Sequence, residues 1–156
     1  NDSPVLIEDE SRLIGQIAVL PEYLLAAKGA NNILLEAPYE ERIARIRQDY
    51  FIDALQQYQK NNPETAFDLL DNFTREAVYR IKKRLGGARY NLINNTLDSA
   101  IITLKSQNDW SGFDDIINVL LSEYYDPIYE YQYQQKIDKT IFKGSQTEII
   151  EWLATV

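Results

Sequence analysis

The spacing of apolar residues changes near residue 38, and this change indicates a mixed α/β architecture. Before it lie two short, continuously apolar runs, residues 4–7 and 33–37, which are typical of buried strands. Between them, residues 20–29 have proline near the start and glycine at the end, a pattern that predicts a short helix. A strand–helix–strand order normally joins parallel strands, and two parallel strands do not form a stable sheet alone. We therefore predict that more of the sheet lies upstream.

After residue 38 the apolar residues recur every three or four positions, which predicts a series of helices. The first runs from Tyr39 to about residue 60. The second starts at Asn62-Pro63 and ends at Gly86-Gly87. The remaining predicted helices start near residue 90, at Ser111 and at Tyr129, and residues 147–153 fit either a helix or a strand.

Two local signals predict where the fourth helix begins and ends. Ser111 with Asp114 resembles a capping box, in which each residue satisfies a backbone N–H of the other. Pro127 is expected to end the helix, with Asp126-Pro127 forming a tight turn. We therefore expect one region of strands, residues 1–38, and one helical region, residues 39–156.

The composition removes several kinds of chemistry. The 156 residues include no cysteine and no histidine, which excludes a cysteine nucleophile and the usual zinc ligands. Carboxylates, lysine, tyrosine, serine and threonine remain as the only candidate catalytic groups, so independent hydrolase or redox chemistry is not expected, and we assign no catalytic residue and no metal ligand. No apolar run reaches the roughly 18 residues of a membrane span, and no export signal is visible, so a cytoplasmic protein without membrane contact is predicted.

A charged turn follows the first apolar run. It consists of Glu8, Asp9, Glu10, Ser11 and Arg12. Ligands of open α/β sheets bind beyond the carboxyl ends of the strands, where acidic residues hold magnesium through water and an arginine contacts phosphate. The alternative interpretation is a solvated turn whose arginine pairs with a neighbouring acid.

Arg42 lies at the start of the helix that follows the second strand, with Arg45 and Arg47 close behind it. Arginines on a helical flap can close over phosphates and neutralise developing charge. The alternative is a surface of ion pairs, because Glu41 and Arg45 are suitably spaced along a helix.

One basic segment interrupts an acidic chain. The formal net charge is −8, yet residues 75–89 contain six cations and only one acid. Cations at the end of a helix are favoured by the helix dipole, which explains part of this clustering. The remainder is typical of a surface that binds phosphate backbones, and the candidate contacts are Arg80, Lys82, Lys83, Arg84 and Arg89.

Tyrosines are concentrated in residues 124–133. Tyrosine rings can stack on nucleobases, and they can equally pack in a core while their hydroxyl groups reach polar partners. Packing is the preferred interpretation for this segment.

Five blocks of sequence, in order, resemble the C-terminal half of the tRNA 2-selenouridine synthase family. They are Val5-Leu6-Ile7-Glu8-Asp9-Glu10-Ser11-Arg12-Leu13-Ile14-Gly15, Leu20-Pro21, Leu35-Glu36-Ala37-Pro38 with Glu41-Arg42, Arg84-Leu85-Gly86-Gly87, and Tyr124-Tyr125-Asp126-Pro127-Ile128-Tyr129-Glu130-Tyr131. The first and last blocks are specific, whereas the second and fourth would be weak alone.

The resemblance implies an N-terminal rhodanese-like domain with a catalytic cysteine, followed by a P-loop domain with a helical tail. It implies that sulfur in wobble 2-thiouridine of tRNA is replaced by selenium, with selenophosphate as donor and a geranylated intermediate made from geranyl diphosphate. This chain contains neither the cysteine nor a phosphate loop. We therefore expect a predominantly helical α/β fragment: a remnant of a P-loop NTPase-like parallel sheet of about two strands, then a flap helix, a basic helix and a helical tail.

In that family context, the fragment would be catalytically silent and would contribute tRNA and diphosphate binding. The turn from Glu8 to Arg12, together with Arg42, would face the missing phosphate-loop half, and the cations from Arg80 to Arg89 would contact tRNA. Two alternatives remain: part of another P-loop small-molecule kinase or ATPase, and a helical interaction module without a ligand.

Overall fold

The computed structural model describes residues 5–9, 13–14 and 16–155. The chain divides into two compact units, one formed by Asn1–Glu36 with Lys136–Val156 and the other by Ala37–Gln135. The C-terminal 21 residues therefore group with the N-terminal segment, whereas the sequence division at residue 38 assigned them to the helical region. Each unit is described separately below.

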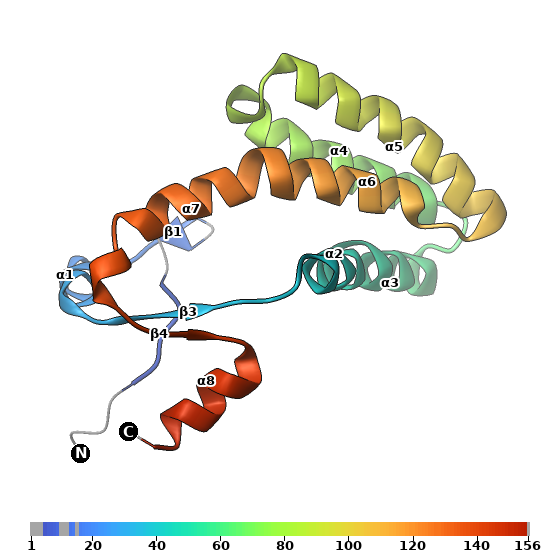
Figure 1. Cartoon of the computed structure of the whole chain (residues 1–156). Helices are drawn as coiled ribbons and strands as arrows, with labels where there is room; N and C mark the ends of the chain where they lie inside the picture. Colours follow the sequence, from blue (N-terminus) through green and yellow to red (C-terminus); the bar gives the residue numbers. More distant parts are fainter. Residues whose placement is uncertain (1–4, 10–12, 15, 156) are drawn as a thin grey trace. The chain divides into compact units, whose positions relative to one another are not determined.

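The first unit contains a small parallel sheet. Strand β3 (Asn32–Leu35) pairs in parallel with β4 (Thr140–Gly144), and the two lie side by side in Figure 1. Helix α1 (Pro21–Gly29) precedes β3, and the short 3-10 helix η3 (Ile137–Lys139) precedes β4. A second, antiparallel pair joins two-residue strands, β1 (Leu13–Ile14) and β2 (Ile17–Ala18). The predicted helix at residues 20–29 and the predicted strand near residue 33 are thus confirmed.

The expected strand at residues 4–7 is wrong where the structure describes it. Pro4 lies outside the described residues, and Val5, Leu6 and Ile7 have no strand structure and are mostly exposed. A strand needs a neighbour for its backbone hydrogen bonds, and β3 instead takes β4 from the far end of the sequence as its parallel partner.

Helix α8 (Gln146–Leu153) closes the first unit and resolves the ambiguity of this segment in favour of a helix. Its start is fixed by a capping box: the Ser145 backbone N–H donates to Glu148 Oε2 at 2.7 Å, and the Glu148 N–H donates to Ser145 Oγ at 3.4 Å. Helix α8 then packs next to β4, where the Phe142 and Trp152 rings stack at 4.8 Å.

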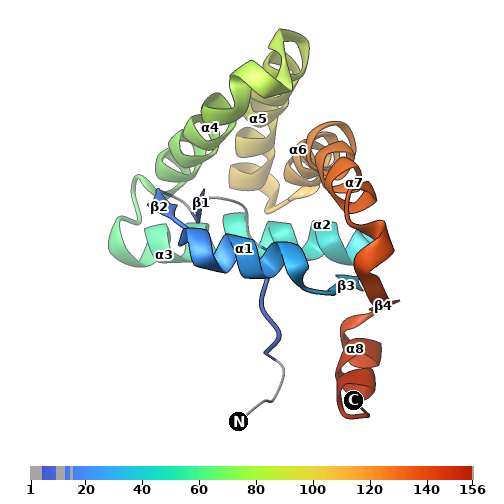
Figure 2. The same cartoon turned by 90° about the vertical axis from the view of Figure 1, so that its left-hand side faces the viewer.

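The second unit is built from helices, and two of its long helices are interrupted by π-helical turns. The first comprises α2 (Tyr39–Arg47), the π turn η1 (Gln48–Ile52) and α3 (Asp53–Asn61). The second comprises α6 (Ser111–Leu120), the π turn η2 (Leu121–Tyr125) and α7 (Asp126–Gln134). Between them in the sequence stand α4 (Ala66–Leu85) and α5 (Gly87–Gln107), which run side by side in Figure 2.

One apolar core holds these helices together. Fifteen buried residues from Phe51 to Tyr124 form a single cluster, to which α4, α5 and α6 contribute most of the members. Phe113 on α6 is fully buried and contacts the rings of Phe51 and Trp110, with centroids 5.0 and 5.3 Å away. Gly112 permits the close approach of α5 and α6, because a Cβ there would lie 2.6 Å from Ala100 Cβ.

Two predicted helix ends are wrong, and a predicted cap does not form, although α6 does begin at Ser111 as expected. Helix α4 begins at Ala66 rather than at Asn62-Pro63, because Thr65 N–H turns back to Asn62 O and closes a separate turn. Ser111 and Asp114 form no capping box, because Asp109 accepts hydrogen bonds of 2.9 Å from both the backbone N–H and the hydroxyl group of Ser111.

Pro127 lies inside a continuing helix instead of ending one, and Asp126-Pro127 is not a tight turn. Proline lacks the N–H that an α-helix needs at interior positions. Here the π turn η2 precedes it, and Asp126 N–H donates to Leu121 O, five residues back. This wider register lets the helix continue past the proline.

Candidate nucleic-acid interface

The connection between α4 and α5 places the basic segment at the end of a helical hairpin. Gly86 alone separates the two helices, with φ 87° and ψ 155°. This backbone conformation is essentially restricted to glycine. The predicted Gly86-Gly87 helix end is therefore confirmed at Gly86, and we call residues 79–90 the hairpin tip.

The cations of the hairpin tip differ in how firmly they are held. Arg80 has one distant acidic neighbour, Glu76 at 3.8 Å, and both side chains are highly exposed. Arg89 is paired with Glu123 at 2.5 Å and also donates to Leu85 O at 3.3 Å. Within the described part of the chain, the exposed side chains of Lys83 and Arg84 have no recorded hydrogen bond or ion pair. Three cations of the tip are thus available to an external anion.

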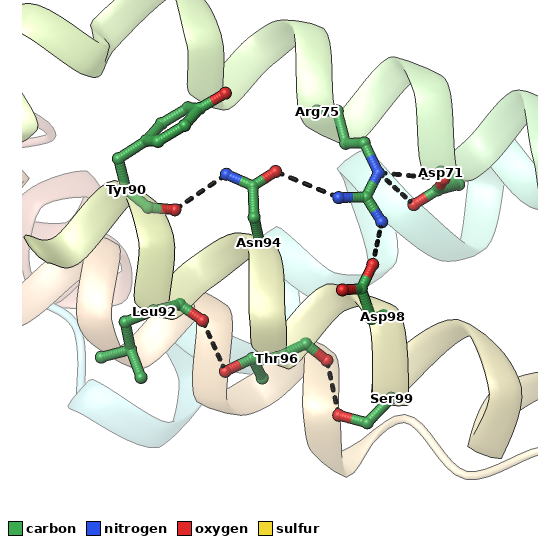
Figure 3. Close-up of polar contacts among 8 residues, drawn as sticks. All are labelled: Asp71, Arg75, Tyr90, Leu92, Asn94, Thr96, Asp98 and Ser99. Atoms are coloured by element: carbon green, nitrogen blue, oxygen red, sulfur yellow. Dashed lines mark hydrogen bonds and ion pairs between the residues drawn. The ribbon is translucent and has the colours of Figure 1, made fainter. Parts of the chain in front are cut away.

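Arg75, by contrast, is a structural residue between α4 and α5. Its guanidinium group donates to Asp71 at 3.0 Å, to Asn94 at 3.1 Å and to Asp98 at 2.5 Å, and Figure 3 shows how these side chains face one another. The hydrogen bond to Asp71 is the main cause of a raised pKa for Arg75, and burial opposes it. Asn94 is itself held by the carbonyl of Tyr90 at 2.8 Å. This network fixes the two helices next to the hairpin tip.

Two tyrosines accompany the cations. The Lys82 ammonium group lies 4.3 Å from the centre of the Tyr90 ring and 5.8 Å from that of Tyr79, which are cation–π distances. A shallow hollow of about 400 Å³ opens beside them, and its lining residues are Arg75, Glu76, Tyr79, Arg80 and Tyr90. The sequence pattern drew attention to the cations but missed both tyrosines, although their spacing around residues 79–90 would have placed them at the same helix ends.

Arg42 lies in a second polar cluster of the same unit. Its guanidinium group forms a two-point contact with the carboxylate of Asp126, at 3.1 Å for Nη1 to Oδ2 and through a second hydrogen bond between Nη2 and Oδ1. The Tyr39 ring lies 5.9 Å away. The hydrogen bond to Asp126 raises the pKa of Arg42, and burial partly offsets it. This geometry is what the ion-pair interpretation of Arg42 predicts, and a phosphate would have to compete with Asp126.

The π turn η2 connects these two clusters. Glu123, within η2, pairs with Arg89 of α5, while Asp126, directly after η2, pairs with Arg42 of α2. Arg47 forms a further ion pair, with Asp114 of α6. Sequence reasoning identified the arginines but not their acidic partners, because those partners lie 34 to 84 positions away in the chain.

The tyrosine-rich segment is divided between core and surface. Tyr124 is buried and contacts the Tyr125 ring edge-to-face at 4.8 Å, and Tyr125 stacks on Tyr129 at 6.3 Å. Burial raises the pKa of the Tyr125 hydroxyl group. Tyr129 and Tyr131 are exposed. Packing in the core thus describes Tyr124, and the outer tyrosines remain available at the surface.

The acidic turn lies in the first unit. Of its five residues, Glu10, Ser11 and Arg12 lie outside the described residues. Asp9 is paired with the Lys136 ammonium group, and the Glu8 carbonyl accepts a hydrogen bond from the Tyr23 hydroxyl at 3.1 Å. Both contacts link the turn to other segments of its own unit. Its role in binding a diphosphate or metal stays a prediction.

Over the residues that the structure describes, no group of three or more acidic, cysteine or histidine side chains could hold a metal ion. The same described residues include no helix both long and apolar enough to cross a membrane.

The fold and the surface together define a predominantly helical α/β protein with a small parallel sheet and a basic helical hairpin. Comparison with known families makes this more specific. The model of the tRNA 2-selenouridine synthase AAA domain matches residues 1–156. The chain therefore belongs to this family, as its sequence blocks predicted.

Proteins named tRNA 2-selenouridine synthase are similar along nearly the whole chain. The protein of Shewanella frigidimarina is 38% identical over 150 residues, and that of Marinobacter nauticus is 40% identical over 151; each alignment covers 96% of this chain and 41% of the relative. That of Hydrogenovibrio crunogenus is 37% identical over 152 residues, covering 97% and 40%. The chain thus spans about two fifths of the length of these relatives. No solved structure matches it.

Proposed function

We propose that the chain is part of a tRNA 2-selenouridine synthase and that the hairpin tip binds tRNA. The observation that carries this proposal is the group of exposed cations at the end of the α4–α5 hairpin. Within the described structure, Arg80 has one acidic neighbour, at 3.8 Å, and Lys83 and Arg84 have no ion pair. The family membership and the names of the relatives support a tRNA substrate over a small molecule.

The charge distribution supports binding at this surface rather than over the whole chain. The net charge of −8 would repel RNA at long range, whereas cations grouped at one helix end attract phosphates within a Debye length of about 8 Å at physiological salt. Each phosphate that a cation neutralises releases counterions, which makes binding salt-dependent. The tip can therefore orient tRNA on an otherwise acidic protein.

The other expected roles belong to the same proposal. The whole enzyme would exchange sulfur for selenium in wobble 2-thiouridine, with selenophosphate and geranyl diphosphate as substrates, in the cytoplasm. A rhodanese-like domain would supply the cysteine that this chain lacks. The β3–β4 pair would belong to a P-loop-type parallel sheet. Glu8, Asp9, Glu10, Ser11, Arg12 and Arg42 would help to bind a diphosphate beside a phosphate loop.

The test is the salt dependence of tRNA binding by the full-length protein. A variant with Arg80→Gln, Lys83→Gln and Arg84→Gln removes three exposed cations. The slope of log K against log salt should become less steep by about two to three units, at roughly 0.7–0.9 per lost phosphate contact. A matched control changes three cations outside the tip, Lys28, Lys60 and Lys105, to glutamine.

The control variant should retain a steeper slope than the tip variant, although it has the same net charge. An equal reduction in both variants would show that only overall charge matters. An unchanged slope in the tip variant would refute binding at the hairpin tip.

A further inference from the structure

The hairpin tip offers more than charge, because the hollow beside its cations is lined by aromatic rings. Tyr79 is 65% exposed, and its side chain forms no recorded hydrogen bond within the described residues. An exposed ring in a basic surface has a free face on which a planar group can stack. Every nucleobase has such a face, whereas the sugar–phosphate backbone does not.

Two of the other lining residues, Arg75 and Tyr90, make contacts that hold their side chains. Arg75 donates to three different side chains, so its guanidinium group is fixed between α4 and α5. Lys82 lies over the Tyr90 ring at 4.3 Å, which holds this ring and the ammonium group together. The hollow of about 400 Å³ is near the lower end of the size range of small-ligand sites. A hollow of this size has room for one nucleotide.

From this arrangement, we propose that the hollow beside Tyr79 binds one unpaired nucleotide of RNA, with its base stacked on Tyr79 and its phosphate near Lys82 and Arg80. Bases of a duplex are already stacked on one another and cannot enter a side pocket without being extruded. The hairpin tip thus distinguishes RNA with unpaired nucleotides from a regular duplex. This inference rests on the proposed tRNA binding and deepens it.

The test replaces Tyr79 in the full-length protein and measures binding to a tRNA transcript and to a fully paired RNA duplex. Tyr79→Ala should weaken tRNA binding roughly tenfold, the usual size of one lost aromatic–base contact, and should leave duplex binding unchanged. The salt slope should stay as in the wild type, because no charge is lost. Tyr79→Phe keeps the ring and should bind like the wild type.

Two further variants separate stacking from other effects of the substitution. Tyr79→Leu keeps apolar bulk without an aromatic face and should behave like Tyr79→Ala. Tyr131→Ala removes an equally exposed tyrosine, 69% exposed on α7, and should leave tRNA affinity unchanged. A thermal melt of each variant monitors folding, which an exposed ring should affect little.

The other possible results show which of the two proposals is wrong, the stacking site at Tyr79 or tRNA binding at the hairpin tip. If Tyr79→Ala binds tRNA normally while neutralising Arg80, Lys83 and Arg84 flattens the salt slope, the stacking site is refuted and tRNA binding at the tip survives. If neither change matters, both proposals fall. If Tyr79→Ala weakens duplex and tRNA equally, or if Tyr79→Phe is as weak as Tyr79→Ala, the ring does not act by stacking on an unpaired base.

Discussion

At the scale of single residues, the two adjacent glycines of the hairpin have different roles. Gly86 has φ 87° and ψ 155°, a conformation unfavourable for any residue with a Cβ, whereas Gly87 has no such conformation. A Cβ at either position would have no atom within 4 Å. Backbone conformation is therefore the only difference between the two positions that a substitution by alanine would test.

Gly86→Ala should lower the free energy of unfolding by about 1–3 kcal/mol, because alanine must adopt a glycine-restricted conformation. Gly87→Ala is the matched control and should be neutral or stabilising by up to about 1 kcal/mol, since alanine is the better helix residue. Urea denaturation monitored by circular dichroism measures both values. Equal destabilisation of the two variants would show that the connection does not depend on the conformation of Gly86.

The polar contacts of single residues were the least predictable from the sequence. The cations of the basic segment were visible as a cluster, but their partners were not, because Arg75 meets Asp98 and Arg89 meets Glu123 only after the helices pack. Likewise, Arg42 looked available to phosphate and is engaged by Asp126 in the structure. Sequence spacing reveals neighbours on one helix, whereas contacts between helices depend on the tertiary fold.

At the scale of secondary-structure elements, helix positions were predictable and several helix ends were not. The three-to-four-residue apolar period correctly indicated the helices after residue 38, because burial of one helix face dominates their stability. The π turns were not predicted: η1 lies inside the helix predicted from Tyr39 to about residue 60, and η2 lets the later helix continue past Pro127, where an end was predicted. The β3–β4 pairing was also missed, since its strands are about 108 residues apart and the sequence gives no register across that distance.

The stability of helix α8 should depend on pH, because its capping box includes the titratable side chain of Glu148. Hydrogen bonds from the side chain and then the backbone of Ser145 lower the pKa of Glu148. A lowered folded-state pKa means that the stabilisation is present above the unfolded value, about 4.3, and is lost as the pH falls through the lower folded value. The cap should therefore weaken in acid below about pH 4.

Ser145→Ala should raise the pKa of Glu148 toward its ordinary value and increase amide exchange at the start of α8 at neutral pH. Ser145→Thr keeps the hydroxyl group and should retain the lowered pKa. An NMR titration of the Glu148 carboxyl group measures the shift in each variant. A pKa of Glu148 that is the same in Ser145→Ala as in the wild type would show that the capping box does not lower it.

At the scale of the whole molecule, the two units differ in how much apolar surface they bury. All fifteen members of the core cluster belong to Ala37–Gln135. Among the described residues of the first unit, Ile149 is the only apolar side chain classed as buried, and eleven large apolar side chains are exposed. Burial of apolar surface is the main favourable contribution to folding. The second unit therefore has what an independent domain needs, and the first does not.

Residues 37–135, expressed alone, should accordingly fold and unfold in one cooperative transition, with a denaturation midpoint close to that of the corresponding transition in the 156-residue chain. Circular dichroism during denaturation measures this transition. A non-cooperative transition would mean that the core needs the first unit.

The amides of the first unit should be weakly protected from hydrogen exchange in the 156-residue chain. In the full-length protein, β3 and β4 should be more strongly protected, because additional sheet would cover the exposed apolar residues of this unit. Hydrogen exchange of the two proteins measures the difference. Equal protection of β3 and β4 in both proteins would mean that nothing further covers this sheet.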